Sequence, residues 1–514
     1  MIDRRLMLAG LAAVPTLAGA APRGDPVATT HYGRVRGLRE GGVLVFRGVR
    51  YGADTAPRRF QRALPPQPWR EVADATRYGA AAPQTRADEP TSEDCLFLNV
   101  WTPALDAGRR PVMVYLHGGA HSHGSGSDPL YDGGNLVRRG DVVVVTLNHR
   151  LAGLGYAYLA ELGGPAESGN VGNLDIVAAL QWVRDNIAAF GGDPGRVMIF
   201  GQSGGGAKVV TLMAMAEARP LFHAAATMSG QHVTAAGPVH ATERARAFMA
   251  KAGARDVASL ATLPVARLVE AMAMTDPLEG KGEISFVSVL DHHVLTRHPF
   301  FPDAPREAAH IPLIVGNTHD ETAAWIGDML KRGDTTWENL PERLVANSTK
   351  DLSPAYVIRR YRELYPEKSP GQILLAATTA GRSWPGHLIQ AEERAKIAAP
   401  TWMYQLDFPA PEAGGVLGAF HTLDVPLVFD NTGAKGARTG NGPDARRLAG
   451  RMADAFIRLA RTGDPNGPGL PAWGQYRLDR RATMIFDRDT RMVDDPRREE
   501  RLLFAMAPYI KPGG

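Results

Sequence analysis

The feature that most constrains the fold is a strand-like apolar run that leads directly into a glycine-rich pentapeptide. The run VMIF (197–200) is followed by GQSGG (201–205), which has the pattern G-x-S-x-G. A sharp strand-to-helix turn can lift one serine hydroxyl clear of the backbone, and small neighbours are needed because the turn is crowded. The pattern therefore predicts that Ser203 is a nucleophile. Because the chain has 56 glycines, a chance match is a real risk. The interpretation depends on finding an oxyanion hole, an acid and a base.

A candidate oxyanion hole lies upstream. The run PVMVYL (111–116) predicts a buried strand, and the loop HGGA (117–120) follows it. Small residues in such a loop allow backbone N–H groups to approach a developing negative oxygen, where preorganised donors lower the barrier most. We expect the oxyanion to be held by the N–H groups of Gly119, Ala120 and Gly204, the last being the residue after the nucleophile.

Other apolar runs and their spacing predict a layered α/β architecture. Near-continuous apolar runs at 142–146, 223–228, 312–316 and 401–406 are typical of strands buried on both faces. Helical spacing of apolar residues predicts one helix around 176–187 and another around 448–459 that stops near Gly463. Alternation of strands and helices favours a mostly parallel sheet, with antiparallel hairpins expected before it around 32–51.

Together these segments resemble the type B carboxylesterase family, the cholinesterase-like and para-nitrobenzyl esterase-like branch of the α/β-hydrolases. Further matching segments, in the family's order, are FRGVRY (46–51), SEDCLFLNV (92–100), NHRL (148–151) and the stretch from GN (169–170) to FGGDP (190–194). The resemblance covers nearly the whole chain after its first 20 residues. It implies an α/β-hydrolase fold: a large, mostly parallel central sheet flanked by helices, with cap insertions over the active site.

The resemblance also implies an acid and a base. NTHDE (317–321) looks like the family segment whose glutamate is the triad acid, so Glu321 is the expected acid and Asp320 the alternative. GAFH (418–421) is similar to the family loop that carries the catalytic histidine, so His421 is the expected base. The acid would orient the imidazole and stabilise the imidazolium without taking the proton. The chain order serine, acid, histidine is the order this fold requires.

Several further residues are expected around the triad. Ser229 lies in a segment similar to one whose serine supports the family's triad, and its hydroxyl could bond Glu321 or His421. Gln202 and Asp424 are also expected to lie next to the triad and support it. The expected substrate-pocket residues are His121, His123, Trp325, Phe286 and Ile284.

The chain departs from the family pattern at the elbow and beside the oxyanion loop. Gln202 stands where most members have an acidic residue, and Gly204 where alanine is usual. The missing carboxylate argues against a specialised choline-ester enzyme. His121 and His123 replace positions that are often aromatic. The sequence leaves open whether they bind substrate or only cap the loop.

The first 20 residues have the pattern of a secretory signal. A basic start with Arg4-Arg5 precedes an apolar stretch, and Ala18-Gly19-Ala20 is a suitable cleavage site. The arginine pair favours the twin-arginine route, with the general route and an uncleaved anchor as alternatives. We therefore expect an exported protein, periplasmic or secreted, in which 21–514 form one catalytic domain with cap insertions around 232–300 and 322–395.

Composition sets limits on partners and cofactors. A formal charge of +4, spread along 514 residues, is too small to predict nucleic-acid binding. Cys95 is the only cysteine, so no intramolecular disulfide can form. No ligand cluster with metal spacing appears, so no metal and no cofactor is expected. No membrane insertion is expected after signal cleavage, and the oligomeric state is left open.

The predicted function is hydrolysis of a small to medium carboxylic ester through an acyl-enzyme on Ser203. The same machinery could act on a carbamate, an amide or a lactone, because fold does not fix substrate. A non-catalytic binding protein is the third hypothesis, although such relatives typically lose triad residues and this chain has all of them.

Overall fold

The computed structural model describes residues 24–509, so the expected leader at 1–20 lies outside the described residues. Within that range the main element is an 11-stranded sheet with the order β14-β13-β12-β11-β10-β9-β7-β8-β6-β4-β3. The strands from β8 through β13 pair in parallel, and the pairs at both edges are antiparallel. The expectation of a mostly parallel sheet is confirmed.

The strands follow the apolar runs closely. Their bounds are β3 Leu38–Glu40, β4 Val43–Arg50, β6 Phe97–Thr102, β7 Arg110–Leu116, β8 Val143–Leu147, β9 Gly192–Gln202, β10 Ala224–Met228, β11 Leu313–Thr318, β12 Thr401–Leu406, β13 Ala482–Phe486 and β14 Arg491–Asp494. A small second sheet pairs β1 Val27–Thr30, β2 Gly33–Arg36 and β5 Ala73–Asp74.

Helices cover both faces of the large sheet, which explains why its strands are apolar at every position. In β7, Val112 and Val114 pack into one hydrophobic cluster, whereas Met113 and Tyr115 pack into another. Successive side chains of a strand point to opposite faces, so both faces of β7 are core. Helices α3 (Val171–Asn186) and α4 (Gly204–Ala214) supply the first cluster. Helices α1 (Gly134–Gly140) and α14 (Pro443–Thr462) supply the second.

The two predicted helices are present. Helix α3 ends at Asn186 and α14 ends at Thr462. Gly463, just beyond α14, has a left-handed φ of 78°, a conformation that glycine adopts without steric cost. Three further short helices are α2 (Ala152–Tyr156), α13 (Val425–Val428) and α15 (Arg498–Phe504).

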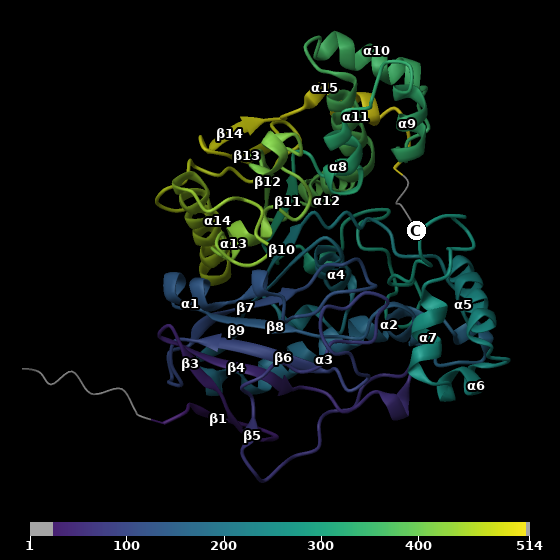
Figure 1. Cartoon of the computed structure of the whole chain (residues 1–514). Coiled ribbons are helices and arrows are strands. Elements are labelled where there is room, and N and C mark those ends of the chain that lie inside the picture. The colour runs from purple at the N-terminus through teal and green to yellow at the C-terminus, as the bar shows by residue number, and fades with distance from the viewer. Residues whose placement is uncertain (1–23, 510–514) are drawn as a thin grey trace, which may run out of the picture.

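The two segments expected to form a cap carry most of the other helices. The first contains α5 (Pro238–Ala252), α6 (Val257–Thr262) and α7 (Val265–Met272), which lie together on the right of Figure 1. The second contains α8 (Ala323–Arg332), α9 (Leu340–Asn347), α10 (Pro354–Leu364), α11 (Pro370–Thr378) and α12 (Trp384–Lys396). Helices α8 to α11 form the group at the top of the same view.

Among the helices of residues 24–509, none combines the length and the apolar character needed to cross a bilayer.

Candidate active site

Ser203 occupies a strained turn between β9 and α4. Its φ of 57° and ψ of −123° lie outside the regions that non-glycine residues prefer. The glycines beside it are required by close backbone approach: a Cβ on Gly205 would lie 1.9 Å from the Leu116 carbonyl oxygen, and one on Gly204 would lie 1.9 Å from that of Ala120. The turn therefore packs directly against the end of β7 and the loop that follows it. Strain of this kind is typical of functional sites.

The 117–120 loop places unpaired donors beside Ser203. Gly119 and Ala120 both have left-handed φ values, 81° and 53°. Within residues 24–509, the N–H groups of Gly119, Ala120 and Gly204 donate to no protein acceptor. Gly204 is buried, Gly119 is half-buried and Ala120 is exposed. None of the three N–H groups has a partner among the described residues that would compete with a ligand oxygen. The geometry is compatible with the oxyanion hole predicted from the sequence, and that role stays a prediction.

Glu321 is buried with no exposed surface and is held by three donors. His421 Nδ1 contacts Oε2, while the Ser229 hydroxyl and the Thr318 N–H donate to Oε1 at 2.5 and 2.9 Å. Burial alone would raise the pKa of Glu321. The positive charge that His421 can carry and the hydrogen bonds to the carboxylate outweigh that effect and hold the pKa at about 2. The carboxylate is therefore ionised throughout the neutral range.

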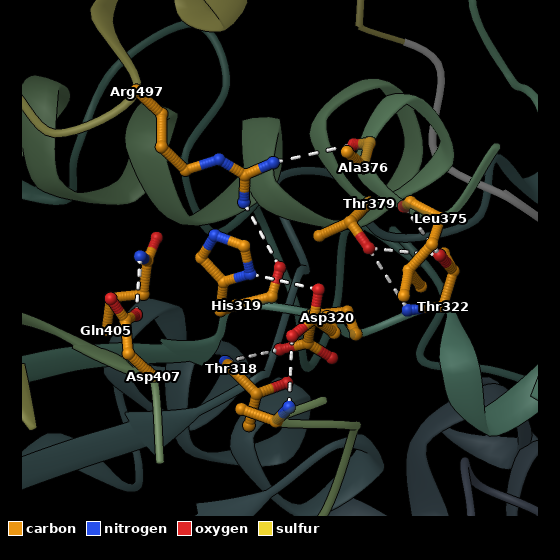
Figure 2. A network of polar contacts seen from close by, with 12 residues as sticks. Thr318, His319, Asp320, Thr322, Leu375, Ala376, Thr379, Gln405, Asp407 and Arg497 are labelled. Atoms are coloured by element: carbon orange, nitrogen blue, oxygen red, sulfur yellow. Dashed lines mark hydrogen bonds and ion pairs between the residues drawn. The ribbon is translucent and has the colours of Figure 1, made fainter. Parts of the chain in front are cut away.

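Asp320, the alternative acid, has different partners. Its Oδ1 lies 2.9 Å from His319 Nδ1, and its Oδ2 accepts from the Ala419 N–H at 3.0 Å. Figure 2 shows the His319–Asp320 pair together with Arg497, which donates to the His319 carbonyl at 3.2 Å. Asp320 thus links the strand end at β11 to the loop that precedes His421. The contact with His421 itself belongs to Glu321.

Gln202 and Asp424 also lie close to the triad, but only Gln202 touches it. The Gln202 amide nitrogen lies 3.3 Å from His421 Nε2, the ring nitrogen opposite the Glu321 contact. Asp424 instead accepts from the Tyr404 hydroxyl at 2.7 Å. Burial raises the pKa of Asp424 to about 6, so this carboxyl group can be protonated in mildly acidic solution.

A cavity of about 210 Å³ joins Ser203 and His421. Two of the five predicted pocket residues line it. The His121 ring lies 5.3 Å from that of His232, and the Trp325 ring lies 5.0 Å from that of His421. His123 lines a neighbouring hollow on the other side of the oxyanion loop, so it is not part of this cavity.

The prediction for Ile284 and Phe286 is wrong. Both side chains are 4% exposed and pack into the cluster formed by α2, α5 and α7, where the Phe286 ring lies 5.4 Å from that of Phe248. The residues between and after them, Ser285 and Val287, line the cavity instead. The chain is extended here, so alternate side chains point in opposite directions. The sequence therefore predicted the correct segment, but the side chains it selected point away from the cavity.

Besides Ala207 on α4, four polar cavity residues distant from the elbow were missed: Gln231, His232, Arg382 and Tyr509. None belongs to a recognisable motif, and each comes from a segment distant in sequence from the elbow. Only the three-dimensional packing brings them together. Within residues 24–509, no cluster of side chains suited to a metal ion is present.

A buried lysine was also missed. Lys208, on α4, has no exposed surface, and its ammonium group donates to the carbonyls of Ala120 at 2.9 Å and His117 at 3.3 Å. These two carbonyls flank the oxyanion loop. Lys208 therefore ties the loop to the helix that carries Ser203. Burial lowers the pKa of Lys208 to about 7, because a charge in a dry interior is poorly solvated.

We expect Lys208→Met to change how stability depends on pH. The folded pKa is below the ordinary value of 10.5, so the unfolded chain binds more protons and wild-type stability rises between about pH 7 and pH 10. Methionine removes this slope. Relative to wild type, the free energy of unfolding of the variant should therefore be higher at pH 6 than at pH 9.5, by roughly 3 kcal/mol.

Urea unfolding at the two pH values measures this difference. Lys251→Met, at an exposed position in α5, removes the same charge and should show no such pH dependence. Equal effects of Lys208→Met at both pH values would contradict the prediction. The variant should also lose turnover, because the oxyanion loop loses two hydrogen bonds.

Comparison with known proteins gives matches that cover nearly the whole chain. The model of a family described as "Carboxylesterase family" matches residues 24–505. The chain is 34% identical to the para-nitrobenzyl esterase of Bacillus subtilis (strain 168), covering 92% of this chain and 97% of that one. It is 33% identical to the phenmedipham hydrolase of Pseudarthrobacter oxydans, covering 90% and 94%. Among solved structures, a Geobacillus stearothermophilus carboxylesterase superposes with a TM-score of 0.82 at 36% identity, covering 93% and 99%.

Proposed function

The chain belongs to the carboxylesterase family and is a carboxylic ester hydrolase, and we propose that Ser203, Glu321 and His421 carry out its reaction. The observation that supports this most directly is the contact of buried Glu321 with His421, which lines the same cavity as Ser203. A nucleophile, a base and an orienting carboxylate at one site are the parts that acyl transfer needs.

The reaction then has two halves. In the first, Ser203 Oγ attacks the ester carbonyl carbon while His421 Nε2 takes its proton. The negative oxygen is held by the N–H groups of Gly119, Ala120 and Gly204. The tetrahedral species collapses as His421 returns the proton to the departing alcohol. In the second half, water attacks the acyl-enzyme with the same base, and the carboxylic acid leaves.

Gln202 has a defined place in this scheme. If His421 Nδ1 donates to Glu321, then Nε2 is an acceptor, and the Gln202 amide can donate to it across 3.3 Å. The contact orients the imidazole before substrate binds, and it must weaken when Nε2 takes the serine proton. Because Gln202 is neutral, the elbow has no carboxylate to attract a cationic alcohol.

A phosphonate probe and a substrate panel test the proposal. A fluorophosphonate should label one serine per chain, and mass spectrometry should place the label on the peptide that contains Ser203. The enzyme should hydrolyse p-nitrophenyl esters of short to medium acyl length faster than the matched anilides. Stoichiometric labelling of another serine would contradict the nucleophile, and faster turnover of the anilides would favour an amide substrate.

We also propose that the enzyme is exported to the periplasm or the medium. The support is the sequence pattern of residues 1–20, together with a family match that begins downstream of it at residue 24. N-terminal sequencing of the enzyme from the periplasmic and culture fractions should find a mature chain that begins at Ala21. An intact leader on active cytoplasmic enzyme would contradict export.

A further inference from the structure

Arg382 enters the active-site cavity from an unusual backbone element. It lies on the π-helical turn Thr379–Ser383, between α11 and α12, and lines the cavity that contains Ser203. The turn is anchored beside the triad: the Thr379 hydroxyl lies 3.0 Å from that of Thr322, the residue after Glu321 (Figure 2). Single π-helical turns that interrupt α-helices are frequently found at functional sites.

The guanidinium of Arg382 has no charged partner in residues 24–509. No ion pair and no hydrogen bond joins it to a described residue, although its Cζ lies 4.5 Å from the centre of the Trp325 ring. The carboxylate whose charge acts on it is Glu321. That carboxylate already accepts hydrogen bonds from Ser229 and Thr318 and contacts His421.

The fully buried arginines of the described chain, Arg150, Arg244 and Arg394, all have polar protein partners, unlike the partly buried Arg382. Arg150 and Arg244 each form an ion pair with a buried aspartate, at 2.7 Å in both cases. Arg394 has no acid beside it, but its guanidinium donates to three backbone carbonyls and to Thr401. Burial lowers the pKa of Arg382 and also that of Arg394, but Arg382 lacks the hydrogen bonds that stabilise the charge of Arg394.

No carboxylate of the described residues lines the cavity around Arg382. None of the described residues that line it is Asp or Glu, and the elbow position that could have supplied a carboxylate is Gln202. An unpaired, partly buried guanidinium with an aromatic face beside it is well suited to a carboxylate, because its planar fork can donate two parallel hydrogen bonds to two oxygens. The ligand that completes this pair would have to enter with the substrate.

We propose that Arg382 binds a carboxylate carried by the ester substrate, so that the enzyme prefers acidic esters to neutral ones of the same shape. The proposal rests on the hydrolase activity proposed above and specifies its substrate class. The carboxylate can belong to the acyl part, as in a monoester of a dicarboxylic acid, or to the alcohol part, as in an ester of a hydroxybenzoate. Both present the same group to the guanidinium.

Two matched substrate pairs test the proposal and separate the two sources. Monomethyl adipate against methyl hexanoate tests the acyl side, and 4-acetoxybenzoate against its methyl ester tests the alcohol side. In wild type, kcat/KM for the charged member of one pair should exceed that of its neutral partner by at least about tenfold. In Arg382→Gln this ratio should fall by about 30-fold or more, because a desolvated charge pair is lost.

The control variants separate a local contact from a loss of net charge. Arg382→Lys keeps the charge but not the planar fork, so the ratio should fall less than in Arg382→Gln. Arg332→Gln removes an exposed charge at the end of α8 and should leave the ratio unchanged. A second readout needs no variant: adipate should inhibit wild-type hydrolysis of the neutral ester at least about tenfold more strongly than adipamide.

Three results would overturn the proposal. These are equal rates for both members of both pairs in wild type, a preference for the charged ester that survives Arg382→Gln in a folded protein, and equal inhibition by adipate and adipamide. Failure of the proposed function gives a different pattern. Wild type would then turn over neither member of either pair, and the phosphonate would not label Ser203.

Discussion

Replacing Ser203 with alanine should lower kcat for a p-nitrophenyl ester by about 10⁴- to 10⁶-fold, the range seen when a triad nucleophile is removed. Folding should be preserved. Within residues 24–509 the Ser203 hydroxyl makes no hydrogen bond to protein, so its removal leaves no buried partner unsatisfied. Alanine also tolerates the φ of 57° no worse than serine does.

Steady-state kinetics and a thermal unfolding midpoint measure both parts of this prediction. Ser229→Ala is the matched control, because Ser229 lines the same cavity and donates to Glu321 at 2.5 Å. Its loss leaves Glu321 in contact with His421 and Thr318, so kcat should fall only about tenfold, the cost of roughly one hydrogen bond to a charged group. If Ser203→Ala retained more than about a hundredth of the wild-type kcat, the nucleophile would be another residue.

The fold could be predicted from sequence because its signals are local. Uninterrupted apolar runs mark strands that are core on both faces, and those at 111–116 and 401–406 match β7 and β12 to within one residue. The left-handed Gly463 ends α14 where the sequence placed the stop. These features depend on the chain's own periodicity and turn chemistry, which do not require knowledge of distant contacts.

The site was predicted only where a motif marks it. The elbow, the 117–120 loop and the segments around Glu321 and His421 carry recognisable patterns, and the structure brings them to one cavity. Lys208, Arg382 and Tyr509 lie outside those patterns. What makes them part of the site is burial and proximity, which are properties of the packed molecule rather than of any short stretch of sequence.

The error at Ile284 and Phe286 has the same physical origin. In an extended segment beside a cavity, one face is core and the other is lining, and apolar residues are expected on the core face. The side chains that face the cavity, Ser285 and Val287, are smaller. Choosing the largest apolar residues of such a segment as pocket walls therefore selects its buried face.

Glu321→Gln should lower kcat by about 10³- to 10⁴-fold, close to the cost of the same change in a serine-protease triad. The amide of glutamine can donate to His421 Nδ1, which would shift the ring proton to Nε2. In that tautomer the base cannot accept the proton of Ser203. The variant also loses the negative charge that stabilises the imidazolium. Since the pKa of Glu321 is about 2, wild type keeps this charge down to strongly acidic pH.

Asp320→Asn is the matched control for that variant, because it removes a carboxylate from the adjacent residue. Asparagine can still accept from the Ala419 N–H, although its bond to His319 weakens, so we expect stability to fall and kcat to fall by no more than about tenfold. Rates measured at saturating substrate, with circular dichroism as the check on folding, separate the two acids. If Asp320→Asn cost as much as Glu321→Gln, the orienting carboxylate would be shared between them. If it cost more, Asp320 would be the acid, and the His421–Glu321 contact would be only a resting arrangement.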